Sequence, residues 1–408
     1  MTTTSIRHRR GTHRVSSPEE TRARIWPWLT PFGITRVANV TGLDRIGIPV
    51  VAVYRPNARS LSVAQGKGCT LASAEVSGVM ESIEFHHAEN ISQPLLYGSY
   101  EQLRAARRLI DPEVLPRSAV GRWGPDFKVS WIEGVDLIQE ETCWVPFELV
   151  HTDFTLPLPP GSGCFPMTSN GLASGNHLLE AVSHGMSEVI ERDAATLFGL
   201  SSAGEQEGRR IVPATVDAPG CQELLARFDR AGVAVALFDM TCDTGVSVFR
   251  AVIADAVLDP ERPRSPSTGT GCHPSRDIAL SRALTEAAQS RLTMIAGSRD
   301  DLPRERYSAD GDLDQLRSRR DRIFRGEARR SFRDAPTFEA EDIGDDVLWQ
   351  KERLLTIGVA HVVVVDLTQA DVSIPVVRVL IPELEPPSDL PGWLPGKRAK
   401  ARQGRTAL

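Results

Sequence analysis

The alternation of hydrophobic and polar positions along the chain predicts three long helices separated by groups of strands. Apolar residues recur with the helical period over 70–90, 177–200 and 276–295, and each of these stretches is predicted to be an amphipathic helix. Shorter runs rich in β-branched residues predict strands. Because hairpin-like strand groups alternate with the helices, an α+β fold with antiparallel or mixed sheets is expected rather than a doubly wound sheet. The strand-like stretches are 34–54, 128–132, 144–150, 231–255, 359–367 and 374–381.

Local signals set the limits of several elements. Asn176 is the predicted N-cap of the helix over 177–200, since a short polar side chain there can accept from the first free backbone N–H groups. Two alternating apolar runs separated by Cys-Asp-Thr-Gly indicate a hairpin within 231–255. A loop is expected over 260–271, whose sequence is PERPRSPSTGTG, and the highly charged residues 300–345 are expected to form exposed helix and loop.

The same patterns divide the chain into three parts. Residues 1–20 are expected to form an N-terminal arm, and residues 21–385 a single domain with intertwined subdomains. Residues 386–408 form a tail that is Pro-rich and then basic.

Composition narrows the class of protein. The chain has 408 residues with 41% hydrophobic and 25% charged residues, which is ordinary for a globular protein. The net charge of −6 means that the chain lacks the overall excess of basic residues that is typical of nucleic-acid-binding proteins. No apolar run approaches the ~20 residues of a membrane span, and the six cysteines include no CxxC pair, so neither a zinc site nor a disulfide framework is indicated. We expect a cytoplasmic protein without nucleic-acid or membrane partners.

A repeat links the three predicted helices. In each helix an Ala precedes a Glu by seven positions, and a second Glu, or a Gln, follows three residues later. The repeats lie about one hundred residues apart, which is too far for a stacked solenoid, so we interpret them as three related helices that converge in one fold. The Ala–Glu pairs are Ala74 and Glu81, Ala181 and Glu188, and Ala279 and Glu286; the residues that follow are Glu84, Glu191 and Gln289.

Carboxylates at positions i and i+3 share a helix face, so convergence of the three helices would gather several acidic groups. Such a cluster repels itself unless cations lie within it, and hard oxygen ligands favour Mg²⁺. Arg192 follows Glu191, and Arg282 lies one turn before Glu286; arginine suits bidentate contact with phosphate. Carboxylates with arginines match the needs of phosphoryl transfer. The predicted metal ligands are Glu81, Glu84, Glu180, Glu188, Glu191 and Glu286.

Two other interpretations fit parts of this pattern. Any one Glu pair at this spacing is more often a solvated helix face than a metal site. A metal-dependent hydrolase that uses no ATP is disfavoured, because its arginines would have no phosphate chain to hold.

Three segments together resemble the YcaO family. They are QGKGCTLASAEVSGVMESIEFHHAEN over 65–90, TSNGLASGNHLLEAVSHGMSEVIERDA over 168–194, and GTGCHPSRDIALSRALTEAAQSR over 269–291. The resemblance extends over residues ~10–385. It implies a YcaO-type fold in which three related helices converge on an ATP and Mg²⁺ site, with 21–385 as the catalytic domain.

The resemblance also implies roles for individual residues. The six glutamates would be metal ligands or their supports, and Glu191, Arg192 and Arg282 would be the catalytic residues. Asn176, Arg192 and Arg282 would bind the nucleotide. Arg14 and Thr21 have the spacing of a Lys/Ser pair that contacts nucleotide in the family, although the residue types differ. Ala173 stands where some members carry a Ser.

Members of the family activate backbone amides of ribosomally made peptides, so a precursor peptide is the implied substrate. Azoline-forming members often end in PxPxP, whereas this chain ends in EPPSDLPGWLPGKRAKARQGRTAL. That ending and ITRVANVTGLDRIGIPV near the N-terminus are similar to YcaO proteins paired with a TfuA partner, which are associated with thioamide formation. A thioamide-forming enzyme with a TfuA-like partner is favoured, and a homodimer is expected from the resemblance. An azoline-forming cyclodehydratase and a non-catalytic nucleotide-binding scaffold remain as alternatives.

Overall fold

A computed structural model of the chain describes residues 4–261, 263–299, 301–302 and 313–406. The chain folds into two compact units, and each is assembled from separate stretches of sequence. We refer to residues 1–4, 83–201 and 342–408 as unit 1, and to residues 5–82 and 202–341 as unit 2. The mixed helices and antiparallel sheets of both units confirm the predicted α+β class.

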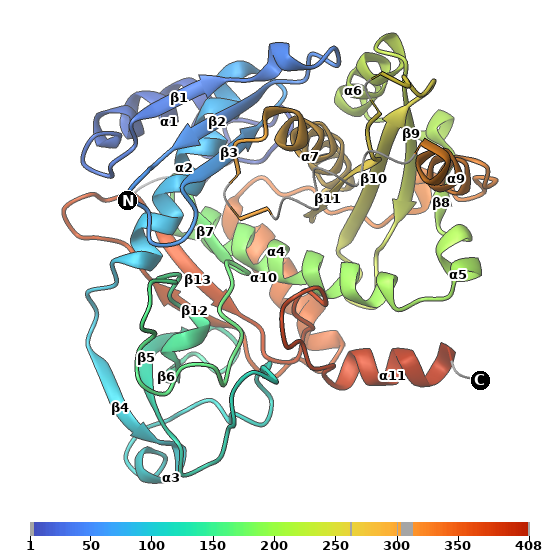
Figure 1. Cartoon of the computed structure of the whole chain (residues 1–408). Coiled ribbons are helices and arrows are strands. Elements are labelled where there is room, and N and C mark those ends of the chain that lie inside the picture. The colour runs from blue at the N-terminus through green and yellow to red at the C-terminus, as the bar shows by residue number, and fades with distance from the viewer. Residues whose placement is uncertain (1–3, 262, 300, 303–312, 407–408) are drawn as a thin grey trace. The chain divides into compact units, whose positions relative to one another are not determined.

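Unit 2 contains two antiparallel sheets (Figure 1). One has the strand order β1-β2-β3 and the other β11-β10-β9-β8. Helix α7 packs along β10 and β11 and also contacts β3, while α6 packs on β9 and α7. The shared core is formed by Phe249 and Ile253 of β10 with Leu280 and Leu284 of α7. The elements are α1 Pro18–Ile25, β1 Arg36–Asn39, β2 Val50–Tyr54, β3 Val63–Lys67, α5 Ala203–Glu207, β8 Arg210–Ile211, α6 Pro219–Arg230, β9 Val233–Asp239, β10 Ser247–Asp255, β11 Ser267–His273, α7 Arg276–Ala296 and α9 Leu313–Phe324, with short 3-10 turns at Trp26–Trp28, Thr41–Leu43, Pro213–Thr215 and Phe332–Asp334.

Unit 1 is built on one antiparallel sheet with the order β4-β5-β12-β13-β7, to which β6 adds beside β5. Helix α4 packs on β13 and β7, and α10 packs on α4. Gly185 of α4 allows this close approach, because a Cβ atom there would clash with Val379. The elements are β4 Leu95–Ser99, α3 Tyr100–Leu103, β5 Lys128–Asp136, β6 Glu141–Pro146, a 3-10 turn at Phe147–Leu149, β7 Leu172–Ser174, α4 Leu178–Gly199, α10 Ile343–Thr356, β12 Val363–Asp366, β13 Val376–Leu380 and α11 Lys397–Thr406.

The three predicted long helices are present. They are α2 (Leu71–Glu89), whose first part belongs to unit 2 and whose last part belongs to unit 1, together with α4 and α7. The predicted N-cap of α4 was wrong by one residue. His177 is the N-cap, and its Nδ1 accepts from the N–H of Leu179 at 3.2 Å. Asn176 instead directs both its backbone N–H and its side-chain amide to the carboxylate of Glu180.

Each predicted strand stretch contains a strand, with two errors of extent. The strand expected over 144–150 ends at Pro146, where the 3-10 turn Phe147–Leu149 follows. Strands β9 and β10 form the hairpin expected within 231–255. The loop predicted over 260–271 was wrong from Ser267 onward, because β11 begins there and pairs with β10. The Ser and Gly residues of this segment give it a low β-strand propensity, so the sequence did not predict a strand there. They are nevertheless suited to it, since Gly269 and Gly271 let α7 lie directly on the strand backbone. The charged stretch 300–345 includes α9 and residues outside the described ranges.

The C-terminal segment of unit 1 is anchored on α4. Arg398 of α11 forms a two-pronged ion pair with the buried Asp193, at 2.9 Å for each contact. The backbone N–H of Glu385 donates to the same carboxylate, and the Glu385 side chain accepts from Gly396 and Ala399 at the start of α11. Within the part of the chain that is described, no helix has the length and apolar character that a bilayer crossing requires.

Candidate active site

Unit 2 contains two copies of one strand–helix arrangement, which explains part of the repeat seen in the sequence. In the first copy, β3 precedes α2, and Gly66 lies against Ala74. In the second, β11 precedes α7, and Gly271 lies against Ala279. Both alanines are fully buried, so they mark the point where the helix meets the strand backbone. The acidic residue seven positions later then faces back to the strand.

Each of these acidic side chains is held by the strand of its own copy. Glu81 accepts from the backbone N–H of Gln65 at 3.1 Å. Glu286 accepts from the backbone N–H and the hydroxyl of Thr270, both at 3.1 Å. Gln65 and Thr270 directly precede Gly66 and Gly271, the glycines that lie against the helices. The two copies therefore orient their carboxylates in the same way, with a backbone N–H from this position of the strand. Backbone donors of this kind fix an acidic side chain without neutralising it.

A lysine joins the two copies. Lys67 of β3 places its Nζ 2.6 Å from Oε2 of Glu286. The side chain of Gln289 also reaches β3, where its Nε2 donates to the carbonyl of Gln65 at 2.8 Å. The acidic groups of α2 and α7 in unit 2 are therefore parts of one polar cluster with its own internal cation.

The environment of Glu81 raises its pKa above the ordinary value of 4.5. Burial is the main cause, and the neighbouring Glu286 adds to it, whereas Arg299, the N–H of Gln65 and Lys67 act in the opposite direction. An ionised carboxylate that is desolvated and close to another one gains most from a bound divalent cation. This donor set therefore suits a hard ion such as Mg²⁺.

We expect Glu81→Gln to stabilise the metal-free protein at neutral pH. Because the pKa of Glu81 is raised in the folded protein, the fold is more stable with Glu81 protonated than with Glu81 ionised. This extra stability is fully present below about pH 4.5 and is lost as the pH rises through the folded-state pKa. The variant should thus melt roughly 2 °C higher than the wild type at pH 8 and differ little at pH 4. Melting curves in chelator-treated buffer across this range are the measurement. A variant that is less stable at every pH would contradict this account of Glu81.

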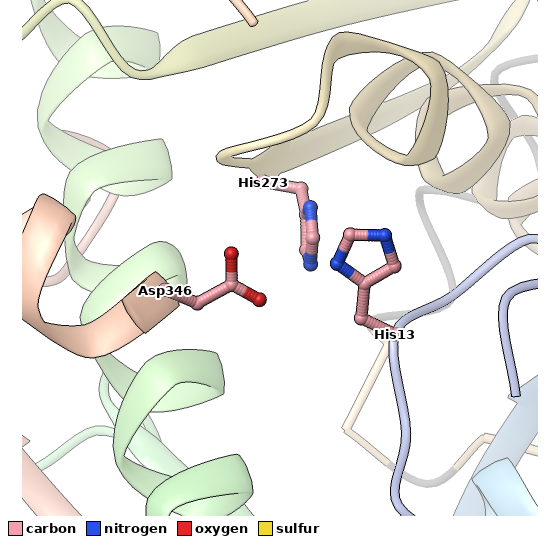
Figure 2. Close-up of side chains that lie close together, drawn as sticks. All are labelled: His13, His273 and Asp346. Carbon is pink, nitrogen blue, oxygen red and sulfur yellow. The ribbon is translucent and has the colours of Figure 1, made fainter. Parts of the chain in front are cut away.

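Positive and imidazole groups gather at another point in unit 2. The rings of His13 and His273 meet edge to face, with centroids 5.0 Å apart (Figure 2). Burial lowers the pKa of His273 well below its ordinary value, and the neighbouring His13, Arg282 and Arg14 lower it further. Two arginines that the sequence assigned to nucleotide binding, Arg14 and Arg282, thus act on the same imidazole. The carboxylate of Glu339 lies 3.5 Å from Nε2 of His13, and the two guanidinium groups suit contact with an anion such as phosphate.

Thr21 has a different environment from Arg14. It lies in α1, is almost fully buried, and donates its hydroxyl to the carbonyl of Ser17 at 2.9 Å. This bond satisfies the hydroxyl within its own helix. Arg14 precedes the helix and donates from Nη1 to the carbonyl of His13.

In unit 1, most of the predicted site residues are held by neighbours. Glu84 accepts from the backbone N–H and the hydroxyl of Ser174, at 2.9 and 2.6 Å. Glu180 is fully buried, and its Oε2 accepts from the N–H and the amide of Asn176 at 2.7 and 3.2 Å. Glu191 pairs with Arg192 at 3.0 Å. Glu180 therefore serves to position Asn176 and the start of α4.

Helix α4 is buried around most of its surface and leaves one half-buried polar stripe, which contains His184, Glu188 and Arg192. The stripe has helical spacing, so these side chains share a face. In α7, the corresponding positions Arg282 and Glu286 are half-buried as well. In each helix these half-buried polar side chains share one face.

Glu188 has a cationic neighbour that the sequence did not reveal. Arg378 of β13 is 1% exposed, and burial lowers its pKa to about 10 while the carboxylate of Glu188 opposes this shift. Its Nε donates to the carbonyl of Leu149 at 2.9 Å, and its Nη2 donates to the carbonyl of Thr168. Within the described ranges, its Nη1 has no acceptor.

The described acidic residues of unit 1 do not form a compact cluster of three carboxylates. Among its described residues, no three of the predicted glutamates have oxygens that all lie within 4.8 Å of one another. The convergence of three helices on one site involves both units and stays a prediction from the sequence. Each unit nevertheless contains carboxylates that could bind a divalent ion and an arginine that could bind phosphate: Glu81, Glu286 and Arg282 in unit 2, and Glu84, Glu188, Glu191 and Arg192 in unit 1.

Comparison with known proteins identifies the family. A sequence profile described as YcaO cyclodehydratase, ATP- and Mg²⁺-binding, matches residues 65–385. The chain belongs to the YcaO family. The family binds ATP and Mg²⁺, so both cofactor predictions are confirmed.

Similar proteins agree with this assignment. An uncharacterised protein in the tfuA 3' region of Rhizobium leguminosarum bv. trifolii is 38% identical over 91% of this chain and 88% of its own length. YcaO from Methanopyrus kandleri, solved with AMPPCP and Mg²⁺, has a TM-score of 0.71 at 25% identity, covering 94% of this chain and 95% of that protein. A heterocyclase in complex with substrate and cofactor gives a TM-score of 0.76 at 20% identity, with 95% of this chain and 54% of that one covered. This last likeness concerns the fold alone.

Several residues of this YcaO site escaped the sequence analysis. Ser174 and Thr270 were missed because their bonds to Glu84 and Glu286, which use the backbone N–H and the hydroxyl together, depend on how strand and helix pack. Lys67 stands within the Gly-rich stretch before α2, between Gly66 and Gly68, so its place was a usable signal. Arg378 interrupts a run of valines in β13, and a single charged residue in an otherwise apolar strand was a second one.

Proposed function

We propose that this YcaO protein activates a backbone amide of a peptide by ATP-dependent phosphorylation of the amide oxygen, and that attack by sulfide then yields a thioamide. Membership of an ATP- and Mg²⁺-binding family supports the first part. The observation that carries the choice of thioamide is the 38% identity, over most of both chains, with a protein from a tfuA 3' region. The C-terminal sequence supports the same choice, since it lacks PxPxP.

The chemistry explains why ATP is required. An amide oxygen is a poor leaving group, so exchange of oxygen for sulfur needs that oxygen to be made a better one. Sulfide adds to the carbonyl carbon, and the resulting oxyanion takes the γ-phosphoryl group. Cleavage of the C–O bond then releases phosphate, which carries the former amide oxygen, and leaves a C=S bond. ATP, sulfide and the amide thereby become ADP, phosphate and the thioamide.

The residues have distinct roles in this proposal. The carboxylates that would hold Mg²⁺ are Glu81, Glu84, Glu188, Glu191 and Glu286. The ion would offset the negative charge of the phosphate groups. Arg192 and Arg282 would contact the phosphates. Asn176, positioned by Glu180, would bind the nucleotide, and Arg14 would add positive charge near Arg282. For Thr21 we propose a contact in which its hydroxyl accepts, because this hydroxyl and the backbone N–H of Thr21 both already donate to the carbonyl of Ser17.

Partners follow from the same proposal. The substrate would be a ribosomally made precursor peptide, and a TfuA-like protein would assist, as the genomic setting of the Rhizobium relative suggests. A homodimer is proposed from the family resemblance.

Mass spectrometry of a candidate peptide tests the proposal. After incubation with ATP, Mg²⁺, sulfide and the TfuA-like partner, we expect a gain of about 16 Da for each modified amide, since sulfur replaces oxygen. A loss of about 18 Da, at a Cys, Ser or Thr, would instead reveal an azoline. ATP consumption must be required for the change. A peptide that is unmodified in the presence of every component, while the protein binds but does not hydrolyse ATP, would favour a scaffold.

A further inference from the structure

Lys67 is a cation within reach of solvent that has no role in the function proposed above. Its side chain is 23% exposed, and that of its partner Glu286 is 25% exposed. The strand that carries it is fixed, because Gly66 lies against the backbone of α2 at Ala74 and Gly78. Only the flexible stem of the lysine is therefore free to change its position.

The ion pair competes with the proposed role of Glu286. Thr270 supplies two donors to Oε1 of this carboxylate, and Lys67 holds Oε2 at 2.6 Å. A divalent cation that binds Oε2 would meet the ammonium at close range, and like charges at such distances repel strongly in a partly desolvated site. Lys67 and a metal ion thus cannot both keep this contact.

We propose that Lys67 is an exchangeable counter-ion of the site. Its ammonium pairs with Glu286 in the absence of a divalent ion, and moves to the triphosphate when Glu286 takes the ion. Lysine suits this exchange, since it is a compact charge with three donors on a flexible stem and is a common phosphate ligand. The inference rests on the proposed function, because it requires Glu286 to bind the metal of a nucleotide site.

Two binding measurements on the full-length chain test the exchange in Lys67→Met, which keeps a long apolar stem and removes the charge. Calorimetry with Mg²⁺ alone should give tighter binding than in the wild type, by about fivefold, because a competing charge has been removed. Calorimetry with AMPPCP and Mg²⁺ should give weaker binding, by about tenfold, because a phosphate contact is lost. A purely structural salt bridge would not move the two affinities in opposite directions.

Two further variants provide the controls. Lys351→Met removes a lysine of similar exposure, 22%, which pairs with Glu140 in unit 1, and it should leave both affinities unchanged. Lys67→Arg keeps the charge and should restore AMPPCP binding to within about threefold of the wild type. If Lys67→Met is unfolded by circular dichroism, Lys67→Gln takes its place.

The outcomes separate this inference from the proposed function. Wild-type protein that fails to bind AMPPCP with Mg²⁺ would overturn the proposed function and the exchange together. Normal wild-type binding, with both affinities of Lys67→Met unchanged or shifted in the same direction, would overturn only the exchange.

Discussion

Replacement of Glu191 by Gln is expected to lower ATP turnover by about 10³-fold, which corresponds to the several kcal/mol that a metal site contributes to transition-state stabilisation. The side chain is only 6% exposed and contacts Arg192 at 3.0 Å. Glutamine has nearly the same shape and can still accept from Arg192, so the helix should remain folded. What is lost is the negative charge that a divalent ion and an arginine share.

Turnover of ATP by the purified variant, measured at saturating Mg²⁺ with the peptide and partner present, is the direct test. Glu352→Gln is the matched control, because it makes the same change on the exposed surface of α10 in the same unit. The control should keep wild-type turnover. Undiminished turnover in Glu191→Gln would remove this residue from the metal site.

Replacement of Gly66 by Ala is expected to destabilise unit 2 by more than ~3 kcal/mol, at the upper end of overpacking effects. A Cβ atom at this position would fall inside the van der Waals surface of the Ala74 carbonyl and of the Gly78 backbone. These are main-chain atoms of α2, so no side-chain rotation relieves the clash. The helix would have to move away from β3, and the bond between Gln65 and Glu81 would break with it.

Thermal or urea unfolding of the metal-free protein measures this effect. Gly220→Ala provides the comparison, since Gly220 lies in α6 of the same unit with no atom within 4 Å of an added Cβ. That change should be neutral or stabilise by up to about 1 kcal/mol, because alanine is the better helix former. Equal stability of the Gly66→Ala and wild-type proteins would show that the close packing of β3 on α2 is not needed.

The periodic parts of the fold could be predicted from the sequence, because a helix that is buried except along one polar stripe repeats its polar positions at the helical period. This holds for α4 and α7, whose predicted limits are accurate to about one residue. Strand β11 could not be predicted, since its Gly and Thr residues are selected by the approach of α7 rather than by strand propensity. The N-cap of α4 was misplaced because Glu180 draws both donors of Asn176 to itself.

The candidate site divides in the same way. The Ala–Glu spacing revealed Glu81 and Glu286, because alanine at the helix–strand contact and glutamate two turns later are both fixed by helix geometry. The contact between Lys67 and Glu286 joins residues 219 positions apart, and no local pattern encodes such a pair. Arg378 was missed for a related reason, since its effect on Glu188 arises only from the pairing and packing of β13.

The central claim is that acidic side chains of α2, α4 and α7 bind the ions that accompany ATP. A crystal structure of the protein grown with AMPPCP and Mn²⁺ tests it most directly, because the anomalous signal of Mn²⁺ locates each ion independently of the refined coordinates. We predict ions bonded both to phosphate oxygens and to carboxylates that include Glu81, Glu191 and Glu286. Ions that contact the nucleotide alone, with these three side chains bound to protein donors only, would contradict the account.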